Sequence, residues 1–355
     1  MKLSDAMRGR LVLNSRDVTI SNIEKEYIKE VVYNDKKIKA QFENPKEIIS
    51  SLELIDRNFY YDIYKFSHQG LTFCLKFGEL DDIYLFKKEF DHLKKIKNSE
   101  ICPTPIIVGK TKQYAFFIMS YEFGFTLKDI GSGIFMENIE NFGKKMFELH
   151  NCYKPKKDQT EMFLDRYFAL GDFKEVLDIK TYQGLKKIDV FNKCEKLLTK
   201  IKKIIRLQLN GIIPKNISIC HTNLTGSNVL TNGGKIKFCN FQDSFHINPL
   251  WDLGMASIKL GISDYPLVEE RFLKAYDFKN FKNNNHALVI YKEICSKLVL
   301  YELVCIYFYK LLIPKEDTQV YKMLMTYERI RPVIHNEFTT NIDLLDTMFG
   351  DFNNI

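Results

Sequence analysis

The segment 219–253 constrains the fold of this 355-residue chain more than any other part of it. It contains the triplet His221-Thr222-Asn223, and Asn228 follows Asn223 at five residues. The letters TNGG then separate two short apolar runs, which predicts a β-hairpin whose second strand, 235–241, contains Asn240. We expect this hairpin to bring Asn223, Asn228 and Asn240 towards one point.

The spacing of these residues follows the needs of phosphoryl transfer, which uses one carboxylate to orient the acceptor hydroxyl and a metal ion held by a second carboxylate and an asparagine. The segment resembles the signature of the aminoglycoside phosphotransferase and choline kinase family, which has a protein-kinase-like fold. That signature reads His-x-Asp, four residues, Asn, then Ile-Asp-Phe or Ile-Asp-Trp, then Pro-x-x-Asp-Leu. His221 and Asn228 match it, as does 248–253 (NPLWDL), but Asn223 and Asn240 stand where the family has its catalytic and metal aspartates.

Upstream segments match the same family in the expected order. Lys76, in the apolar run 71–77, corresponds to the phosphate-binding lysine, and Glu89 is placed on a following amphipathic helix to pair with it. Glu122 and Phe123 fall in a segment that resembles the family's hinge, where backbone groups hold the adenine. The resemblance therefore implies ATP or GTP as the nucleotide, with Lys76, Glu89, Glu122 and Phe123 around it.

A phosphate-covering loop is expected between residues 54 and 66, but this stretch contains no glycine. Such loops use glycine because it lets backbone N–H groups approach phosphates closely. The consecutive residues Phe59, Tyr60 and Tyr61 take up the room instead. The phosphate-covering loop therefore departs from the family pattern.

The two asparagines weaken the predicted chemistry further. An amide cannot accept a proton at neutral pH, and loss of a general base costs on the order of 10²–10⁴ in rate. Mg²⁺ prefers charged oxygen ligands, so a metal site made of Asn228 and Asn240 is weak unless another carboxylate joins it. Asp243 is the nearest candidate for that third ligand. We therefore expect a degenerate kinase site with doubtful Mg²⁺ binding.

Composition fits a globular protein with a large core, because 45% of the residues are hydrophobic and 27% are charged. The net charge of +7 comes partly from lysine clusters at 36–39, 154–157 and 200–206, which we interpret as solvated surface. No nucleic-acid-binding motif accompanies them, so nucleic acid is not an expected partner. Eight scattered cysteines without a C-x-x-C pair and an N-terminus without an apolar core favour a cytoplasmic protein. Charges interrupt the apolar run 294–313, so no membrane span is expected.

We predict an α+β, two-lobed, protein-kinase-like fold with a small antiparallel β lobe and a larger, mainly helical lobe. Residues 1–50 form an N-terminal extension, 51–123 the small lobe and 124–355 the large lobe. Within the extension, 31–40 (VVYNDKKIKA) is interpreted as a strand, a turn and a strand, and a helix is expected to begin at Pro45.

Three functions remain open. The first is a pseudokinase that binds a nucleotide, another small molecule or a protein partner with little phosphoryl transfer. The second is an active ATP-dependent phosphotransferase on a small hydroxylated metabolite, such as an amino sugar, an amino alcohol or a sugar. The third is a structural or assembly component that binds no nucleotide. A filled nucleotide site would favour the third, and a carboxylate of Asp243 within reach of a metal beside Asn228 would favour the second.

Overall fold

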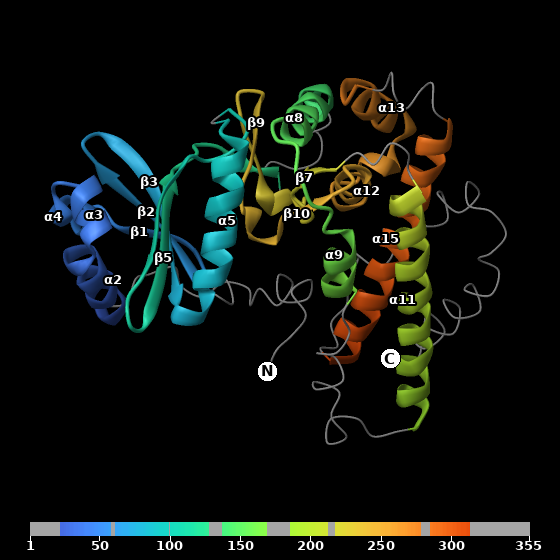
Figure 1. Ribbon diagram of the computed structural model, residues 1–355, viewed down its shortest axis with the longest axis horizontal. Coiled ribbons are helices and arrows are strands. Elements are labelled where there is room, and N and C mark those ends of the chain that lie inside the picture. The colour runs from blue at the N-terminus through green and yellow to red at the C-terminus, as the bar shows by residue number, and fades with distance from the viewer. Residues whose placement is uncertain are drawn as a thin grey trace.

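A computed structural model describes residues 22–57, 61–98, 100–127, 137–168, 185–211, 217–277 and 285–312 (Figure 1). An antiparallel sheet with its helices forms the N-terminal part of the molecule, and a larger, mainly helical part follows. The α+β fold predicted from the sequence is therefore confirmed.

The small lobe is built on a five-stranded antiparallel sheet with the strand order β1-β2-β3-β5-β4. Its strands are β1 (Glu53–Arg57), β2 (Tyr61–His68), β3 (Leu71–Glu79), β4 (Pro105–Lys110) and β5 (Tyr114–Ser120). The register sets Lys76 of β3 opposite Ile63 of β2 and Phe117 of β5, in the interior of the sheet. Strand β3, which the sequence predicted at 71–77, thus has a neighbour on both sides.

Three short helices, α2 (Asn22–Asn34), α3 (Lys36–Gln41) and α4 (Pro45–Ser50), pack an apolar layer against one face of this sheet. Ile28, Ile38 and Phe42 are almost completely buried in that layer. The strand-turn-strand predicted at 31–40 is therefore wrong. The Asp35 carboxylate accepts hydrogen bonds from the N–H groups of Lys37 and Ile38, so it caps a helix and does not form a hairpin turn. The helix expected to start at Pro45 is confirmed.

Helix α5 (Ile83–Ile96) belongs to a second apolar cluster, and Figure 1 shows it between the sheet and the large lobe. Its residues Phe86 and Leu93 are buried in that cluster with Met146 and Trp251 of the large lobe. The helix therefore joins the two lobes through one continuous core.

The large lobe contains helices α8 (Ile139–Asn151), α9 (Thr160–Tyr167), α11 (Leu185–Gly211), α12 (Leu250–Lys259), α13 (Pro266–Ala275) and α15 (Asn285–Leu312). Helix α12 is buried along almost its whole length and packs on α15. Helices α8 and α13 approach closely at Gly143, where an added Cβ would lie 2.7 Å from the carbonyl oxygen of Phe272. Among the described helices, none has the length and apolar character needed to cross a lipid bilayer.

Two small sheets carry the predicted site segment. Strand β6 (Phe125–Thr126) pairs with β8 (Val229–Asn232), which forms a hairpin with β9 (Lys235–Phe238). Gly233 and Gly234 have positive φ values of 54° and 81°, as the two-residue turn of a hairpin requires. Strand β7 (Ser218–Cys220) pairs with β10 (Phe245–Ile247) and places the His221 loop beside this hairpin. The predicted hairpin is confirmed, although β9 ends at Phe238 and leaves Asn240 outside it.

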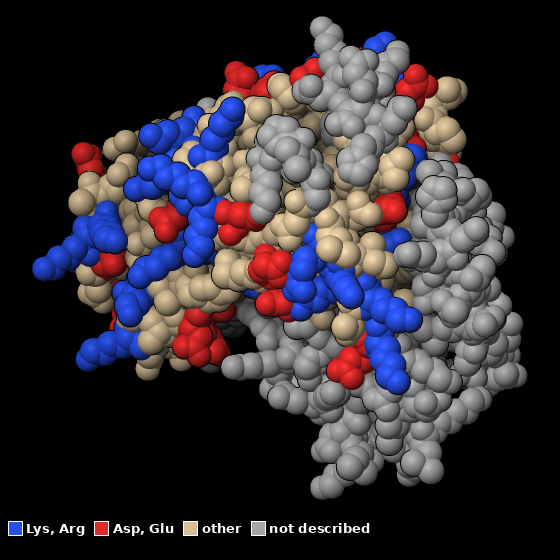
Figure 2. Space-filling view, turned by 45° about the vertical axis from the view of Figure 1, so that its right-hand side comes forward, with Lys and Arg blue, Asp and Glu red and all other residues tan. Residues whose placement is uncertain are grey.

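Lys and Arg side chains gather over the small lobe on the left of Figure 2. Lys36, Lys37 and Lys39 of α3 are exposed, as are Lys154, Lys156 and Lys157 after α8. These two lysine clusters thus lie at the surface, as the sequence analysis expected.

Candidate active site

The backbone of the His221 loop is fixed by one buried carboxylate. Asp252, in the first turn of α12, accepts hydrogen bonds from the N–H groups of His221 at 2.6 Å and Thr222 at 2.8 Å. Thr222 has a φ of 61°, which a β-branched residue adopts only when its surroundings enforce it. The segment 248–253, which matches the family motif, therefore contributes the carboxylate that fixes the backbone of the His221 loop.

His150, at the end of α8, joins the buried hydrogen bonds around Asp252, and we call this group of contacts the His150 hub. Its Nε2 lies 3.1 Å from Asp252, and its Nδ1 lies 2.6 Å from the Tyr276 hydroxyl. His150, Asp252 and Cys220 are close enough together to be considered as metal ligands. Both ring nitrogens and both carboxylate oxygens already have protein partners, so this cluster is a hydrogen-bond hub and not a metal centre.

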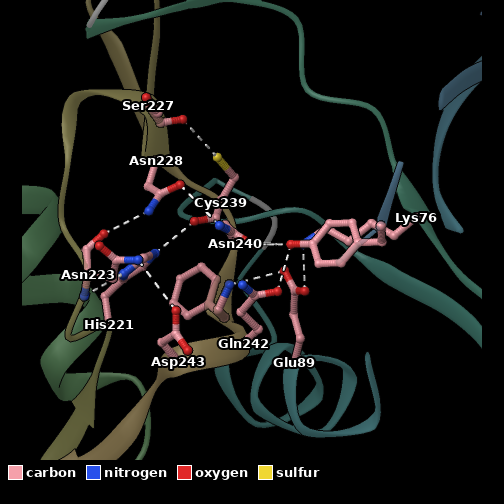
Figure 3. A network of polar contacts seen from close by, with 12 residues as sticks. Lys76, Glu89, His221, Asn223, Ser227, Asn228, Cys239, Asn240, Gln242 and Asp243 are labelled. Carbon is pink, nitrogen blue, oxygen red and sulfur yellow. Dashed lines mark hydrogen bonds and ion pairs between the residues drawn. The ribbon is translucent and has the colours of Figure 1, made fainter. Parts of the chain in front are cut away.

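The three predicted asparagines do meet, and they form a chain of amide hydrogen bonds (Figure 3). The Nδ2 of Asn228 donates to the backbone oxygen of Asn223 at 2.8 Å, and the Nδ2 of Asn240 donates to the Oδ1 of Asn228 at 3.2 Å. Asn240 has a left-handed backbone, with a φ of 69°, and directly precedes a 3₁₀ turn at Phe241–Asp243. Asparagine tolerates this conformation better than most residues. The three asparagines therefore meet as the hairpin predicted, and all three side chains are neutral.

Lys76 and Glu89 form the buried ion pair that the sequence predicted. The Nζ of Lys76 lies 2.6 Å from Oε2 of Glu89, and both side chains are at most 2% exposed. The other oxygen of Glu89 accepts a hydrogen bond from the N–H of Phe241 at 3.0 Å. Burial lowers the pKa of Lys76, but Glu89 and Tyr61 outweigh it and hold this pKa above its usual value. The lysine is thus charged, and Glu89 links α5 to the segment that follows Asn240.

Tyr61, the first residue of β2, reaches the same point from the small lobe. Its hydroxyl oxygen lies 2.6 Å from Oε1 of Gln242, 2.9 Å from Oδ1 of Asn240 and 3.3 Å from Nζ of Lys76. The side chain is 3% exposed, and burial raises its pKa, so the phenol stays neutral. A hydroxyl has one proton to donate. The Tyr61 hydroxyl donates it to Oε1 of Gln242, because this contact is the shortest of the three. Tyr61 therefore fills the space next to Lys76, and its neighbours Phe59 and Tyr60 lie outside the described residues.

Asp243 lies beside Asn223 and Arg166. Its Oδ2 is 3.4 Å from the Nδ2 of Asn223, and its Oδ1 is 3.5 Å from a guanidinium nitrogen of Arg166. The same guanidinium donates to the hydroxyl of Tyr84 on α5 at 2.8 Å. The carboxylate thus stands beside the residue at the catalytic position, and its role as a metal ligand stays a prediction. Arg166 and Gln242 belong to no motif, so the sequence analysis missed both.

The predicted hinge connects the lobes after β5. Glu122 accepts a hydrogen bond from Ser120 at 2.7 Å and pairs with Lys237 of β9 at 2.5 Å. Phe123 is 66% exposed and its backbone oxygen accepts a hydrogen bond from Asn232. The Glu122 side chain therefore ties the hinge to the site hairpin, while the adenine-binding role of this segment stays a prediction.

No protein-family model matches the sequence, and no curated protein matches it. The structure, in contrast, is similar to many solved structures. An ethanolamine kinase from Plasmodium vivax has a TM-score of 0.59 at 12% identity, over 93% of this chain and 94% of that chain. The choline kinase LicA from Streptococcus pneumoniae has a TM-score of 0.54 at 13% identity, over 88% and 99%.

A thermostable mutant of an aminoglycoside phosphotransferase, in a ternary complex with ADP and hygromycin B, has a TM-score of 0.51 at 12% identity. The similarity covers 81% of this chain and 95% of that chain. At such low identities the likeness concerns the fold. The chain therefore has the kinase-like fold shared by choline and ethanolamine kinases and aminoglycoside phosphotransferases.

Proposed function

We propose that this chain is a pseudokinase that keeps the kinase-like fold to bind a nucleotide or a partner and carries out little phosphoryl transfer. The observation that carries this proposal is the contact between Tyr61 and Lys76. The resemblance assigns phosphate binding to Lys76. The ammonium group of Lys76 already contacts three groups of the protein, on Glu89, Asn240 and Tyr61.

The groups that would have to catalyse the reaction are amides. Asn223 directs its Nδ2 towards Asp243, and an amide cannot take the proton of an acceptor hydroxyl. Asn228 and Asn240 offer only neutral oxygens to a dication, and the Oδ1 of Asn240 already accepts a hydrogen bond from Lys76 at 2.9 Å. We therefore expect weak Mg²⁺ binding and a large loss of rate relative to a site with two aspartates.

Nucleotide binding without a metal would differ from that of an active kinase. The positive charge of Lys76 is matched by Glu89, so a polyphosphate without Mg²⁺ gains little attraction and has to displace Tyr61. Solved structures of the same fold hold ADP or AMP-PNP, which supports a nucleotide as ligand. We propose ATP or GTP as the nucleotide, bound mainly through its base and ribose. No disulfide joins Cys74, Cys102, Cys152, Cys220 or Cys239, which supports a cytoplasmic setting.

One observation supports the second candidate, an active phosphotransferase on a small hydroxylated metabolite. The carboxylate of Asp243 lies 3.4 Å from the Asn223 amide, so it could replace the missing base at almost the same place. This activity requires the Asp243 carboxylate, so Asp243→Asn would abolish it, whereas it would leave the ligand binding of a pseudokinase largely intact.

The deciding experiment is a thermal-shift titration with ATP and GTP, with and without Mg²⁺, on this chain and on the double variant Asn223→Asp/Asn240→Asp. Stabilisation of the unchanged chain without metal dependence supports the pseudokinase, and metal dependence that appears only in the double variant strengthens it. Stabilisation of the unchanged chain that grows with Mg²⁺ favours the enzyme. No shift in either protein removes both nucleotide functions and leaves the structural component.

A further inference from the structure

The side of α5 that faces the large lobe carries a basic stripe. Lys88, His92 and Lys95 are spaced by four and three residues, so they share one face of the helix. We call their contact with the large lobe the α5–β10 seam. In it, the Lys88 Nζ lies 3.8 Å from the ring centroid of Phe245, the ring centroids of His92 and His246 are 5.5 Å apart, and the Lys95 Nζ lies 5.8 Å from the ring centroid of Tyr153.

Two histidine nitrogens in the α5–β10 seam lack hydrogen-bond partners. His92 is 5% exposed and His246 is 8% exposed. The Nδ1 of His92 and the Nε2 of His246 are buried, and neither has a partner among the residues that the structure describes. Most buried polar atoms in folded proteins are hydrogen-bonded. Two adjacent exceptions therefore indicate that the seam accepts a further group.

The charges around these rings decide what kind of group fits. Burial lowers the pKa of His92 to about 3, assisted by Lys88, His246 and Lys95, while a hydrogen bond with the Phe241 backbone acts in the opposite direction. Burial, Lys95 and Lys88 likewise lower the pKa of His246 to about 4. Arg166 adds a third basic group, with its guanidinium carbon 5.9 Å from the Phe245 ring centroid. A cation is repelled by this environment, whereas an anion is attracted to it.

A metal ion is the obvious alternative ligand for a pair of histidines. The single group of three or more metal-ligating side chains among the described residues is the His150 hub, which lies elsewhere. Two imidazoles flanked by two lysines lack the carboxylate or thiolate that a divalent cation needs in addition. The observations therefore favour an anion.

We propose that the α5–β10 seam binds a small oxyanion, such as phosphate or the phosphoryl group of a metabolite, beside the unpartnered nitrogens of His92 and His246. When the anion binds, the rings take up a proton and donate hydrogen bonds from the nitrogens that now lack partners. Lys88 and Lys95 supply further balancing charge. Because Glu89 lies one turn before His92 on α5, an anion bound here connects the two lobes close to the Lys76–Glu89 pair without occupying that site. This proposal does not depend on nucleotide binding.

The test is a titration of the full chain with inorganic phosphate at constant ionic strength, followed by NMR of the histidine rings. Two imidazole signals should shift, and His92→Gln and His246→Gln should each remove one of them. The pKa of both rings should rise in phosphate. A rise of one unit means that the protonated ring binds phosphate about tenfold more tightly than the neutral ring. His68→Gln is the matched control, because His68 is also buried but pairs with Glu47 in the small lobe.

Each outcome decides the proposal. Signals that move equally in chloride, or that do not move in the unchanged chain, overturn it, and this measurement needs no variant to fold. Shifts that survive in both single variants also overturn it, because the site would lie elsewhere. A parallel titration with glycerol phosphate separates the sources: tighter binding than phosphate identifies a phosphorylated metabolite, and equal binding identifies the free ion.

Discussion

The hydroxyl oxygen of Tyr61 lies 3.3 Å from the ammonium nitrogen of Lys76, and the Tyr61 ring centroid lies 5.0 Å from the same nitrogen. The small lobe thus places one of its own aromatic side chains against the residue that should contact phosphate. The arrangement is stabilised on both sides, because Gln242 accepts from the hydroxyl and Phe86 packs against the ring. An anionic ligand at Lys76 therefore competes with a folded part of the chain.

Shortening this side chain should open the nucleotide site. Tyr61→Ala removes a buried ring and should destabilise the fold by about 3–5 kcal/mol, but it should also increase the affinity for ATP. Tyr61→Phe keeps the ring and loses only the hydrogen bonds, so it should cost about 1 kcal/mol and leave ATP binding weak. Urea unfolding and calorimetric titration measure the two effects. Equal ATP affinity in the two variants would show that the ring does not block the site.

Removing the charge of Lys76 should destabilise the protein strongly. Lys76→Met leaves the fully buried Glu89 without its partner, and breaking a buried pair in this way costs about 3–5 kcal/mol. Glu89→Gln in the same chain should restore part of the loss, which urea unfolding of the double-mutant cycle measures. Lys65→Met is the control, because its pair with Glu53 lies at the surface and should contribute little to stability. Similar losses in both single lysine variants would contradict the prediction.

The Asp252 carboxylate should be difficult to replace. Asp252→Asn exchanges an acceptor for a donor next to the buried N–H groups of His221 and Thr222, so we expect a loss of roughly 3 kcal/mol. Hydrogen exchange at these two amides should accelerate more than elsewhere. Asp35→Asn, which keeps an oxygen to cap α3, should change stability by only a few tenths of a kcal/mol. An unchanged exchange rate at His221 would show that the loop is held by other contacts.

Acid should weaken the fold through the two seam histidines. Their pKa values are lowered to about 3 and about 4, whereas an unfolded histidine titrates near pH 6.5, so the unfolded chain binds more protons between these values. The stability that these rings contribute is present above about pH 6.5 and is lost as the pH falls from there towards 4, by up to roughly 1.4 kcal/mol per pH unit for each ring.

Asp82 acts in the opposite direction over part of this window, because burial raises its pKa to about 6 and the folded form keeps the proton. The prediction therefore concerns a difference between proteins. In buffers without phosphate, the double variant His92→Gln/His246→Gln should lose less stability than the unchanged chain between pH 6.5 and pH 4. Parallel curves from urea unfolding would show that neither ring stays neutral in the fold.

The parts of the site that the sequence predicted are formed by residues that lie close together in the chain. The TNGG turn determines the β8–β9 hairpin, and the hairpin brings Asn228 close to Asn240. The Lys76–Glu89 pair follows from a strand and the next helix, each with a clear apolar pattern. In these cases local backbone preferences and the fold agree, so a pattern in the chain is enough to locate the side chains.

Other parts depend on contacts between distant segments and left no local pattern. Arg166 meets Asp243 from 77 residues away, and Tyr61 meets Gln242 from 181 residues away. The error at 31–40 has a different cause. The Asn34-Asp35 pair, which follows the apolar residues 31–33 and precedes two lysines, is compatible with a hairpin turn and with a helix cap. Only the sheet face that the helices cover selects the cap. Both kinds of failure arise because tertiary packing chose between options that are locally equivalent.

The apolar layer formed by α2, α3 and α4 has a practical consequence for production of the protein. A chain shortened to begin at residue 51 would leave Tyr64, Phe66 and Phe116, buried against these helices, open to water on one face of the sheet. Exposed apolar patches on sheets promote aggregation, so the shortened chain should accumulate in inclusion bodies when expressed in bacteria. The helices before the sheet thus act as a built-in solubility partner.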